Sequence, residues 1–192
     1  MSMHSRIMGA CGVLGFALAV VLPASAQMRA DPKLGFGTPV TPQELSGLFA
    51  IPPDGRGLPP GRGTADKGRA VFQEGCAACH GERLEGNLQP GIGGDRLIGG
   101  RGSLATRTPM KTVESYWPYA TTLFDYVKRA MPFNAPGSLT NEQVYAVVAY
   151  ILNQADIIGP NDAMDARTLP AIRMPNRDGF IPDPRPEVQL YR

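Results

Sequence analysis

Three side chains that can do chemistry lie within five consecutive positions of the stretch EGCAACHGERLEG, residues 74–86: Cys76, Cys79 and His80. Residues three apart lie on one face of a helical turn, so both thiols can reach the two vinyl groups of a single porphyrin. The adjacent His80 then presents its imidazole to the iron. The Cys-x-x-Cys-His spacing therefore predicts one covalently attached haem c, with His80 as a metal ligand.

Two other interpretations of the cysteine pair are open from the sequence. A redox-active dithiol needs a thioredoxin-like βαβ context, which the surrounding sequence does not show. A zinc site needs two further cysteine or histidine ligands. Apart from the residues of this motif, the chain contains only Cys11 and His4, both in its N-terminal segment.

A six-coordinate haem iron needs a second ligand, and methionine sulfur is one such partner for histidine. Met131 follows the apolar-periodic segment SYWPYATTLFDYVKRA, which predicts a helix from Ser115 to Pro132. The loop FNAPGSL and a second predicted helix, TNEQVYAVVAYILNQ, come next. Met131 is thus held between two helices and is the predicted second ligand. Met110, Met174 or an open iron position are the alternatives.

Three predicted helical segments position these side chains. The first, TADKGRAVFQEGCAACH, has Thr64 as its N-cap and carries Gly68 one turn before Phe72, a pair that lets another helix cross closely. The last has Thr140 and Gln143 at capping-box spacing. It is the expected crossing partner through Val144, Val147, Val148, Tyr150, Ile151 and Leu152. The glycine-rich stretch between these helices predicts irregular structure, and no strand-like alternation of useful length appears.

The N-terminus has the features of a secretory signal peptide. A short basic segment precedes IMGACGVLGFALAVVLP, an apolar run too short to span a bilayer comfortably, and small residues follow it. Cleavage after Ala26 predicts export to the periplasm without a membrane anchor; a lipidation box at Cys11 is the alternative. Cleavage removes one arginine and no acidic residue, so the net charge falls from +2 to about +1. Such a chain lacks a polybasic signature for nucleic acid.

The sequence divides into four predicted regions. These are the signal peptide (1–26), a Pro/Gly-rich N-terminal extension (27–63), a haem domain (64–156) and an irregular C-terminal extension (157–192). Residues 27–63 contain seven prolines and seven glycines, a composition that favours disorder. Both extensions also carry apolar residues that can pack around the haem domain or grip a partner subunit: Leu45, Leu48, Phe49, Ile51, Leu169, Ile172, Met174 and Phe180.

CAACHGE, the Gly68–Phe72 pair, the Met131–Pro132 loop and VVAYIL occur in the order found in class I cytochromes c, and residues 64–156 resemble that family. The resemblance implies an all-α fold of three to five helices around one haem with histidine and methionine ligands. It also implies that the carbonyl of Pro90 accepts the imidazole N–H; a turn proline is the alternative. Two aromatic residues can line the haem pocket or a partner surface, or simply pack in the core: Tyr116 and Trp117.

A narrower resemblance lies outside the haem motif. PDGRGLPPGRGTADKG, SYWPYATTLFDYVKRAMPFNAPGSL and TLPAIRMPNRDGF are similar to the SoxD-type and sulfite dehydrogenase cytochrome subunits of bacterial sulfur oxidation. This implies an electron carrier whose redox partner is a molybdenum-containing sulfite dehydrogenase or a Sox subunit, with the catalytic centre on that partner. The sequence departs from the longer SoxD proteins because it has one Cys-x-x-Cys-His motif rather than two. The alternative function is a haem enzyme or ligand sensor that uses an iron position vacated by Met131.

Overall fold

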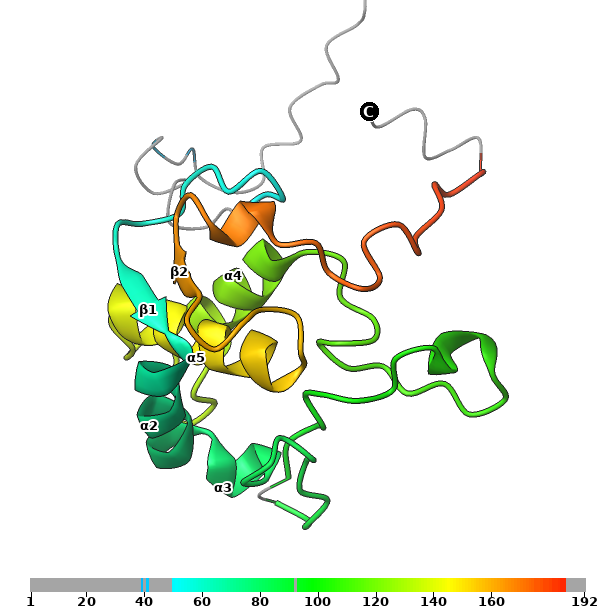
Figure 1. Cartoon of the computed structure of the whole chain (residues 1–192), viewed down its shortest axis with the longest axis horizontal. Helices are drawn as coiled ribbons and strands as arrows, with labels where there is room; N and C mark the ends of the chain where they lie inside the picture. Colours follow the sequence, from blue (N-terminus) through cyan, green and yellow to red (C-terminus); the bar gives the residue numbers. More distant parts are fainter. Residues whose placement is uncertain (1–38, 40, 42–49, 92, 186–192) are drawn as a thin grey trace, which may run out of the picture. The chain divides into compact units, whose positions relative to one another are not determined.

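The computed structural model describes residues 39, 41, 50–91 and 93–185. The chain divides into two units, Met1–Val40 and Thr41–Arg192, and only Pro39 of the first is described. The predicted signal peptide and the apolar residues at positions 45, 48 and 49 therefore lie outside the described residues. The fold is that of the second unit (Figure 1). No helix in its described part has the length and apolar character needed to cross a membrane.

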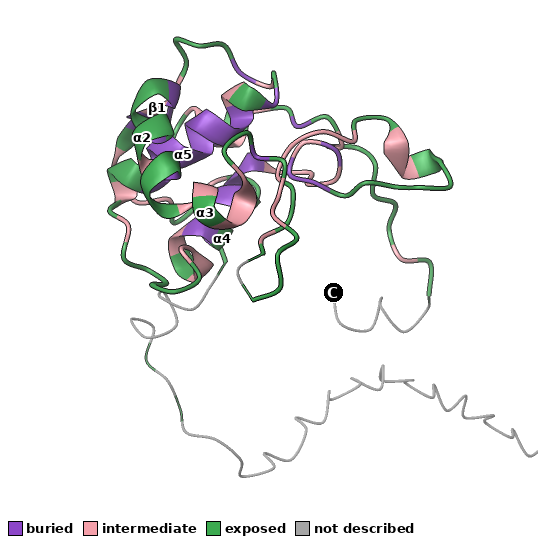
Figure 2. Cartoon of the chain, turned by 90° about the horizontal axis from the view of Figure 1, so that it is seen from below, coloured by how far each residue is buried: buried purple, intermediate pink, exposed green. Residues whose placement is uncertain are grey.

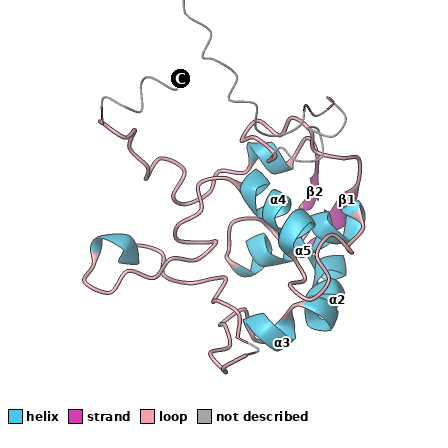
Figure 3. Cartoon of the chain, turned by 180° about the vertical axis from the view of Figure 1, so that it is seen from behind, coloured by secondary structure: helices cyan, strands magenta, loops and turns pink. Residues whose placement is uncertain are grey.

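The described part of the second unit contains four α-helices, α2 (Ala65–Gly75), α3 (Ala77–His80), α4 (Ala120–Ala130) and α5 (Asn141–Gln154), joined by long loops (Figure 3). Short 3-10 turns, η1 (Ser103–Ala105) and η2 (Leu169–Ala171), lie in the loops. Every residue of α5 from Val144 to Leu152 is buried. A helix buried on all sides needs packing partners all round it, and here α2, α4 and the segments Arg62–Thr64 and Ala163–Asp165 supply them.

The predicted crossing of the first and last helices is confirmed. A Cβ on Gly68 would lie only 1.9 Å from the backbone oxygen of Ala146, so the two backbones meet where this glycine stands. One turn further along α2, the ring of Phe72 packs on that of Tyr150 with 5.3 Å between centroids. The small residue and the aromatic pair together fix how closely α2 approaches α5.

The helix that precedes Met131 begins later than the sequence pattern indicates. We expected it to start at Ser115, but α4 starts at Ala120. Pro118 keeps the residue before it out of the helical region. Ser115 instead accepts a hydrogen bond from the backbone N–H of Thr112 (3.0 Å) and donates one to a backbone carbonyl, which makes a compact turn.

The structure also has two short strands that no alternating pattern in the sequence indicates. Residues Arg62–Thr64 (β1) and Ala163–Asp165 (β2) pair antiparallel, with Gly63 opposite Met164. Strands of three residues are too short to show an alternating pattern in sequence. They form because the segment before α2 and the segment after α5 both lie against α5 and so lie next to each other. A Cβ on Gly63 would lie 2.1 Å from the backbone nitrogen of Ala146, so only glycine permits this approach.

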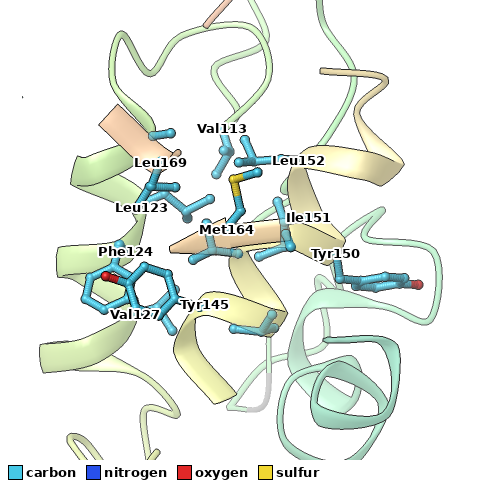
Figure 4. Packing of buried hydrophobic residues seen from close by; sticks show 14 of the residues in the cluster. Val113, Leu123, Phe124, Val127, Tyr145, Tyr150, Ile151, Leu152, Met164 and Leu169 are labelled. Atoms are coloured by element: carbon cyan, nitrogen blue, oxygen red, sulfur yellow. The ribbon is translucent and has the colours of Figure 1, made fainter. Parts of the chain in front are cut away.

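The C-terminal extension packs on the helical domain at least as far as Met174. Met164 and Leu169 are buried in the same core as α4 and α5 (Figure 4). Met174 is buried in this core as well. Among the described residues 175–185, most are exposed (Figure 2). Of the N-terminal extension, Ile51 packs against the core and its backbone N–H donates to Asp125 of α4 (3.1 Å). The sequence hypothesis that the extensions wrap the domain therefore holds for these residues.

Candidate haem-binding site

The two cysteines and the histidine of the motif lie on a single turn that follows α2. The backbone N–H of Cys76 still donates to Phe72 of α2 (2.8 Å), and the chain then starts α3. The N–H groups of Cys79 and His80 both donate to the carbonyl of Cys76, at 3.1 and 2.9 Å. Both thiols are free and half-buried. The turn predicted from the spacing is present, with its thiols available for attachment.

The environment of Cys76 does not suit a redox dithiol. Burial, and secondarily the nearby Cys79, raise the pKa of the Cys76 thiol to about 11. Reactive Cys-x-x-Cys sites instead lower the pKa of their attacking cysteine, so that a thiolate is present at neutral pH. The thiol of Cys76 is therefore protonated and a poor nucleophile, which disfavours the oxidoreductase alternative.

His80 is oriented by a backbone carbonyl, but not by the one we expected. Its Nδ1 lies 2.7 Å from the carbonyl oxygen of Asp95. The predicted partner, Pro90, is exposed, and its role in orienting the imidazole is not supported. Because a carbonyl only accepts, Nδ1 must carry the proton in this contact, which leaves the lone pair on Nε2 for a metal.

Asp95 reaches the histidine because a pair of glycines brings the chain close to α3. The N–H of Gly94 donates to the carbonyl of Cys79 (2.9 Å), and a Cβ on Gly94 would lie 3.0 Å from both the Cε1 and the Nδ1 of His80. A Cβ on Gly93 would lie 2.4 Å from the carbonyl oxygen of Asn87. The Gly93-Gly94-Asp95 sequence is the feature that could have predicted this contact. The spacing between His80 and Pro90 pointed to the wrong carbonyl.

The methionines considered as second ligands lie in different environments. Met131 is the C-cap of α4 and is half-buried against the core. The loop it begins lies close to the last residue of α2, since a Cβ on Gly75 would be 3.7 Å from the Cγ of Pro132. Met174 is 1% exposed and packs in the core, and Met110 lies exposed on a loop. Only Met131 combines partial exposure with a position next to the cysteine-bearing turn.

Half-buried apolar side chains from separate segments pack against the same core as Met131 and Cys76. Leu97 and Ile98 follow Asp95, and Ala77 lies between the cysteines; all three pack on the core without being fully covered. Trp117 is also half-buried and meets the ring of Tyr126 edge-on at 5.7 Å. Such side chains suit the apolar faces of a porphyrin.

Tyr116 points to a different part of the domain. Its ring packs edge-on against Phe180 of the C-terminal extension, with centroids 5.1 Å apart, and the Nζ of Lys111 lies 5.1 Å from its centre. Of the two aromatic candidates, Trp117 therefore contacts α4 and Tyr116 contacts the C-terminal extension.

The donor set of this site fits a haem c. Two free thiols three residues apart, an imidazole held through Nδ1 and a half-buried thioether are the groups that attach and ligate such a haem. In the described residues no three Cys, His, Asp or Glu side chains form a cluster that could hold a metal ion, so the residues do not fit the zinc alternative.

Comparison with known proteins agrees with this geometry. The family model for cytochrome c matches residues 65–155. A chain in the crystal structure of the sulfane dehydrogenase SoxCD from Paracoccus pantotrophus is 37% identical, with a TM-score of 0.69; the match covers 83% of this chain and 78% of that one. The chain belongs to the cytochrome c family. The cytochrome c fold expected from the sequence is thereby confirmed.

A third match is local. The cytochrome is 48% identical to a cytochrome c-553-like protein of Synechocystis sp. over 33 residues, which are 17% of this chain and 31% of that protein. The chain therefore spans about a third of this relative's length. The match supports the cytochrome c assignment and says nothing about a shared partner.

Proposed function

We propose that this protein is a monohaem c-type cytochrome that transfers electrons for an exported sulfur-compound dehydrogenase. The observation that carries the proposal is the single Cys-x-x-Cys-His turn with His80 fixed through Nδ1, in a chain 37% identical to one in the SoxCD crystal structure. When bound, the haem iron supplies a reversible one-electron couple between ferrous and ferric states.

The protein's own residues would hold and tune this group. Cys76, at the N-cap of α3, and Cys79, within α3, would fasten it to the chain, while the carbonyl of Asp95 would keep His80 in the tautomer whose Nε2 is free to ligate. Met131, at the end of α4, is the proposed second ligand. Half-buried apolar side chains such as Leu97 and Trp117 would line the haem. Together with a thioether ligand they would favour the ferrous state, because neither stabilises the extra positive charge of ferric iron.

The partner is proposed from the SoxCD likeness. His80 and Met131 would occupy both open positions of the iron, so a substrate would not bind the metal, and oxidation of a sulfur compound would take place on another subunit. That subunit would be a molybdenum-containing sulfite dehydrogenase or a Sox protein. The signal-peptide features of residues 1–26, which are not among the described residues, support export to the periplasm.

Two measurements on the exported protein test the proposal. Intact mass should show one added haem, and the oxidised protein should show a methionine-to-iron charge-transfer band. Met131→Ala should abolish this band, whereas Met110→Ala should leave it unchanged, because Met110 lies exposed on a loop. Absence of covalent haem, or survival of the band in Met131→Ala, would reject the assignment. Rapid binding of cyanide by the wild type would favour a haem enzyme or sensor.

A further inference from the structure

Positive charge is concentrated in one loop between α3 and α4. Residues 96–113 contain four basic residues and no acidic one, whereas the whole chain has a net charge of only +2. Two of the four have carboxylate neighbours. Arg101 forms an ion pair with Glu114 (3.0 Å), and Arg96 lies near Glu85. Within the described part of the chain, Arg107 has no such partner, and Lys111 has none either but lies over the ring of Tyr116.

The loop that carries Arg107 and Lys111 is held in a defined conformation. The hydroxyl of Ser103 accepts the N–H of Met110 (2.9 Å) and donates to the carbonyl of Gly100 (2.6 Å), which ties the two ends of the loop together. Figures 1 and 3 show this loop, with η1, standing away from the four helices. A fixed loop loses little conformational entropy when a partner binds it, so its cations are presented ready for contact.

The C-terminal extension adds apolar area beside this loop. The side-chain amide of Asn176 donates to the carbonyl of Tyr116 (2.7 Å), and Phe180 packs on the ring of the same tyrosine. Phe180 is half-exposed, and Ile181 is 87% exposed. A crevice of about 270 Å3 separates the two segments, lined by Leu104 and Ala105 on one side and Pro175 and Asn176 on the other.

We propose that these residues form a docking surface for an acidic, partly apolar segment of the dehydrogenase subunit. The basic surface is defined by Arg107, Met110, Lys111, Phe180 and Ile181. The identity of the partner rests on the function proposed above; the surface itself rests on the contacts just described. It includes none of the residues that fasten or ligate the haem, so it holds the cytochrome in a complex without taking part in its redox chemistry.

The composition of the basic surface favours a protein as its occupant. Two uncompensated cations are fewer than the four to eight that mark binding sites for anionic lipids. Arginine, methionine and aromatic side chains are enriched at protein interfaces. Complementary charge speeds the encounter, and the apolar residues contribute to the lifetime of the complex.

The experiment uses the full-length, haem-loaded protein and an acidic octapeptide of six glutamates and two leucines, titrated by calorimetry at low ionic strength. We expect saturable binding that weakens about tenfold in the double variant R107E/K111E, because two favourable charge contacts become repulsive. Phe180→Ser should weaken binding about threefold through lost apolar contact. Circular dichroism checks that each variant is folded.

The matched control is K67E/R69E on α2. Both residues are exposed, the change in net charge is the same, and Figures 1, 2 and 3 all place α2 on the opposite side of the domain from the basic loop. The control should bind the peptide as the wild type does. Equal weakening in both double variants, no binding by the wild type, or tighter binding to phosphatidylglycerol vesicles than to the peptide would overturn the proposal.

Co-purification separates this inference from the proposed function. A tagged wild-type chain should co-purify with a dehydrogenase subunit identified by mass spectrometry, and R107E/K111E should lose it while K67E/R69E retains it. If the wild type brings no dehydrogenase, the proposed function fails, and the peptide titration still decides whether the basic surface binds acidic segments. If R107E/K111E retains the dehydrogenase, docking occurs elsewhere and this inference is wrong.

Discussion

At the scale of single residues, the decisive contact is between His80 and the carbonyl of Asp95. A histidine can ligate through either ring nitrogen, and the hydrogen bond on the other nitrogen selects which one. Here the bond occupies Nδ1 at 2.7 Å. The residue that makes this contact possible is Gly94, because its missing side chain lets the loop lie against the imidazole.

Gly94→Ala should displace this loop from His80. The new Cβ would lie 3.0 Å from two ring atoms of His80 and from the carbonyl oxygen of Cys79. Overpacking of this kind costs about 1–3 kcal/mol of folding free energy. We expect lower thermal stability and altered paramagnetic NMR shifts of the haem methyl groups, which report the orientation of the ligand ring.

The control for Gly94→Ala is Gln89→Ala in the same loop. Gln89 is exposed, and its side chain makes no hydrogen bond in the described part of the chain. It should leave both the stability and the methyl shifts unchanged. If Gly94→Ala behaved like this control, the close packing of the loop on His80 would not determine the ring orientation.

At the scale of helices, the contact between α2 and α5 depends on one glycine. In Gly68→Ala the added Cβ would lie 1.9 Å from the carbonyl oxygen of Ala146 and 2.8 Å from the Cβ of Tyr150, so the helices must separate. We expect a loss of about 2–3 kcal/mol in the free energy of unfolding, measured by denaturant titration.

Gly75→Ala is the same substitution in the same helix and serves as its control. The nearest side-chain atom, in Pro132, would be 3.7 Å away, which is ordinary van der Waals contact. Alanine has the better helix propensity, so this variant should be neutral or more stable by up to about 1 kcal/mol. Equal destabilisation by both variants would show that close approach at Gly68 is not the cause.

The two helix N-caps allow a second test at this scale. Thr140 caps α5 through a complete capping box with Gln143, with bonds of 3.2 and 2.8 Å, as the sequence predicts. Thr64 caps α2 by position, but its side chain makes no capping hydrogen bond. Thr140→Ala should therefore cost about 1 kcal/mol of stability, and Thr64→Ala clearly less. A larger loss at Thr64 would contradict this ranking.

At the scale of the whole domain, α5 is the helix on which two other segments pack: the segment before α2 and the segment that follows α5 itself. The hydroxyl of Tyr145 in α5 donates to the carbonyl of Pro59 (2.9 Å), and burial, with a smaller contribution from the charge of Asp165, raises its pKa to about 12. An unfolded tyrosine ionises near pH 10. The folded state therefore retains a proton that the unfolded state has lost between about pH 10 and 12.

Stability should consequently fall as pH rises through this interval. The measurement is the unfolding free energy by far-UV circular dichroism from pH 8 to 12, in the wild type and in Tyr145→Phe. At pH 8 the variant should lose only the hydrogen bond, about 1 kcal/mol. Above pH 10 the difference between the two proteins should shrink. A constant difference across the range would show that Tyr145 does not contribute to the pH dependence.

The sequence alone determined the elements that depend on local chemistry. The spacing of Cys76, Cys79 and His80, the capping box at Thr140 and the small-aromatic pair of α2 are short-range patterns, and the structure has each of them as predicted. The resemblance to the cytochrome c family, which rests on the order of these patterns, is confirmed by the comparisons. Met131 as second ligand stays a prediction, supported by its position at the end of α4.

Only the tertiary structure decided the contacts that join distant parts of the chain. The choice of Asp95 over Pro90 depends on how a glycine-rich loop folds back on α3, and the β1–β2 pair joins residues about a hundred positions apart. Met174 is a core residue because the C-terminal extension returns to α4 and α5. Such contacts arise from the free energy of burying apolar surface across the whole domain. That free energy depends on residues far apart in the chain, so it cannot be inferred from a short segment of sequence.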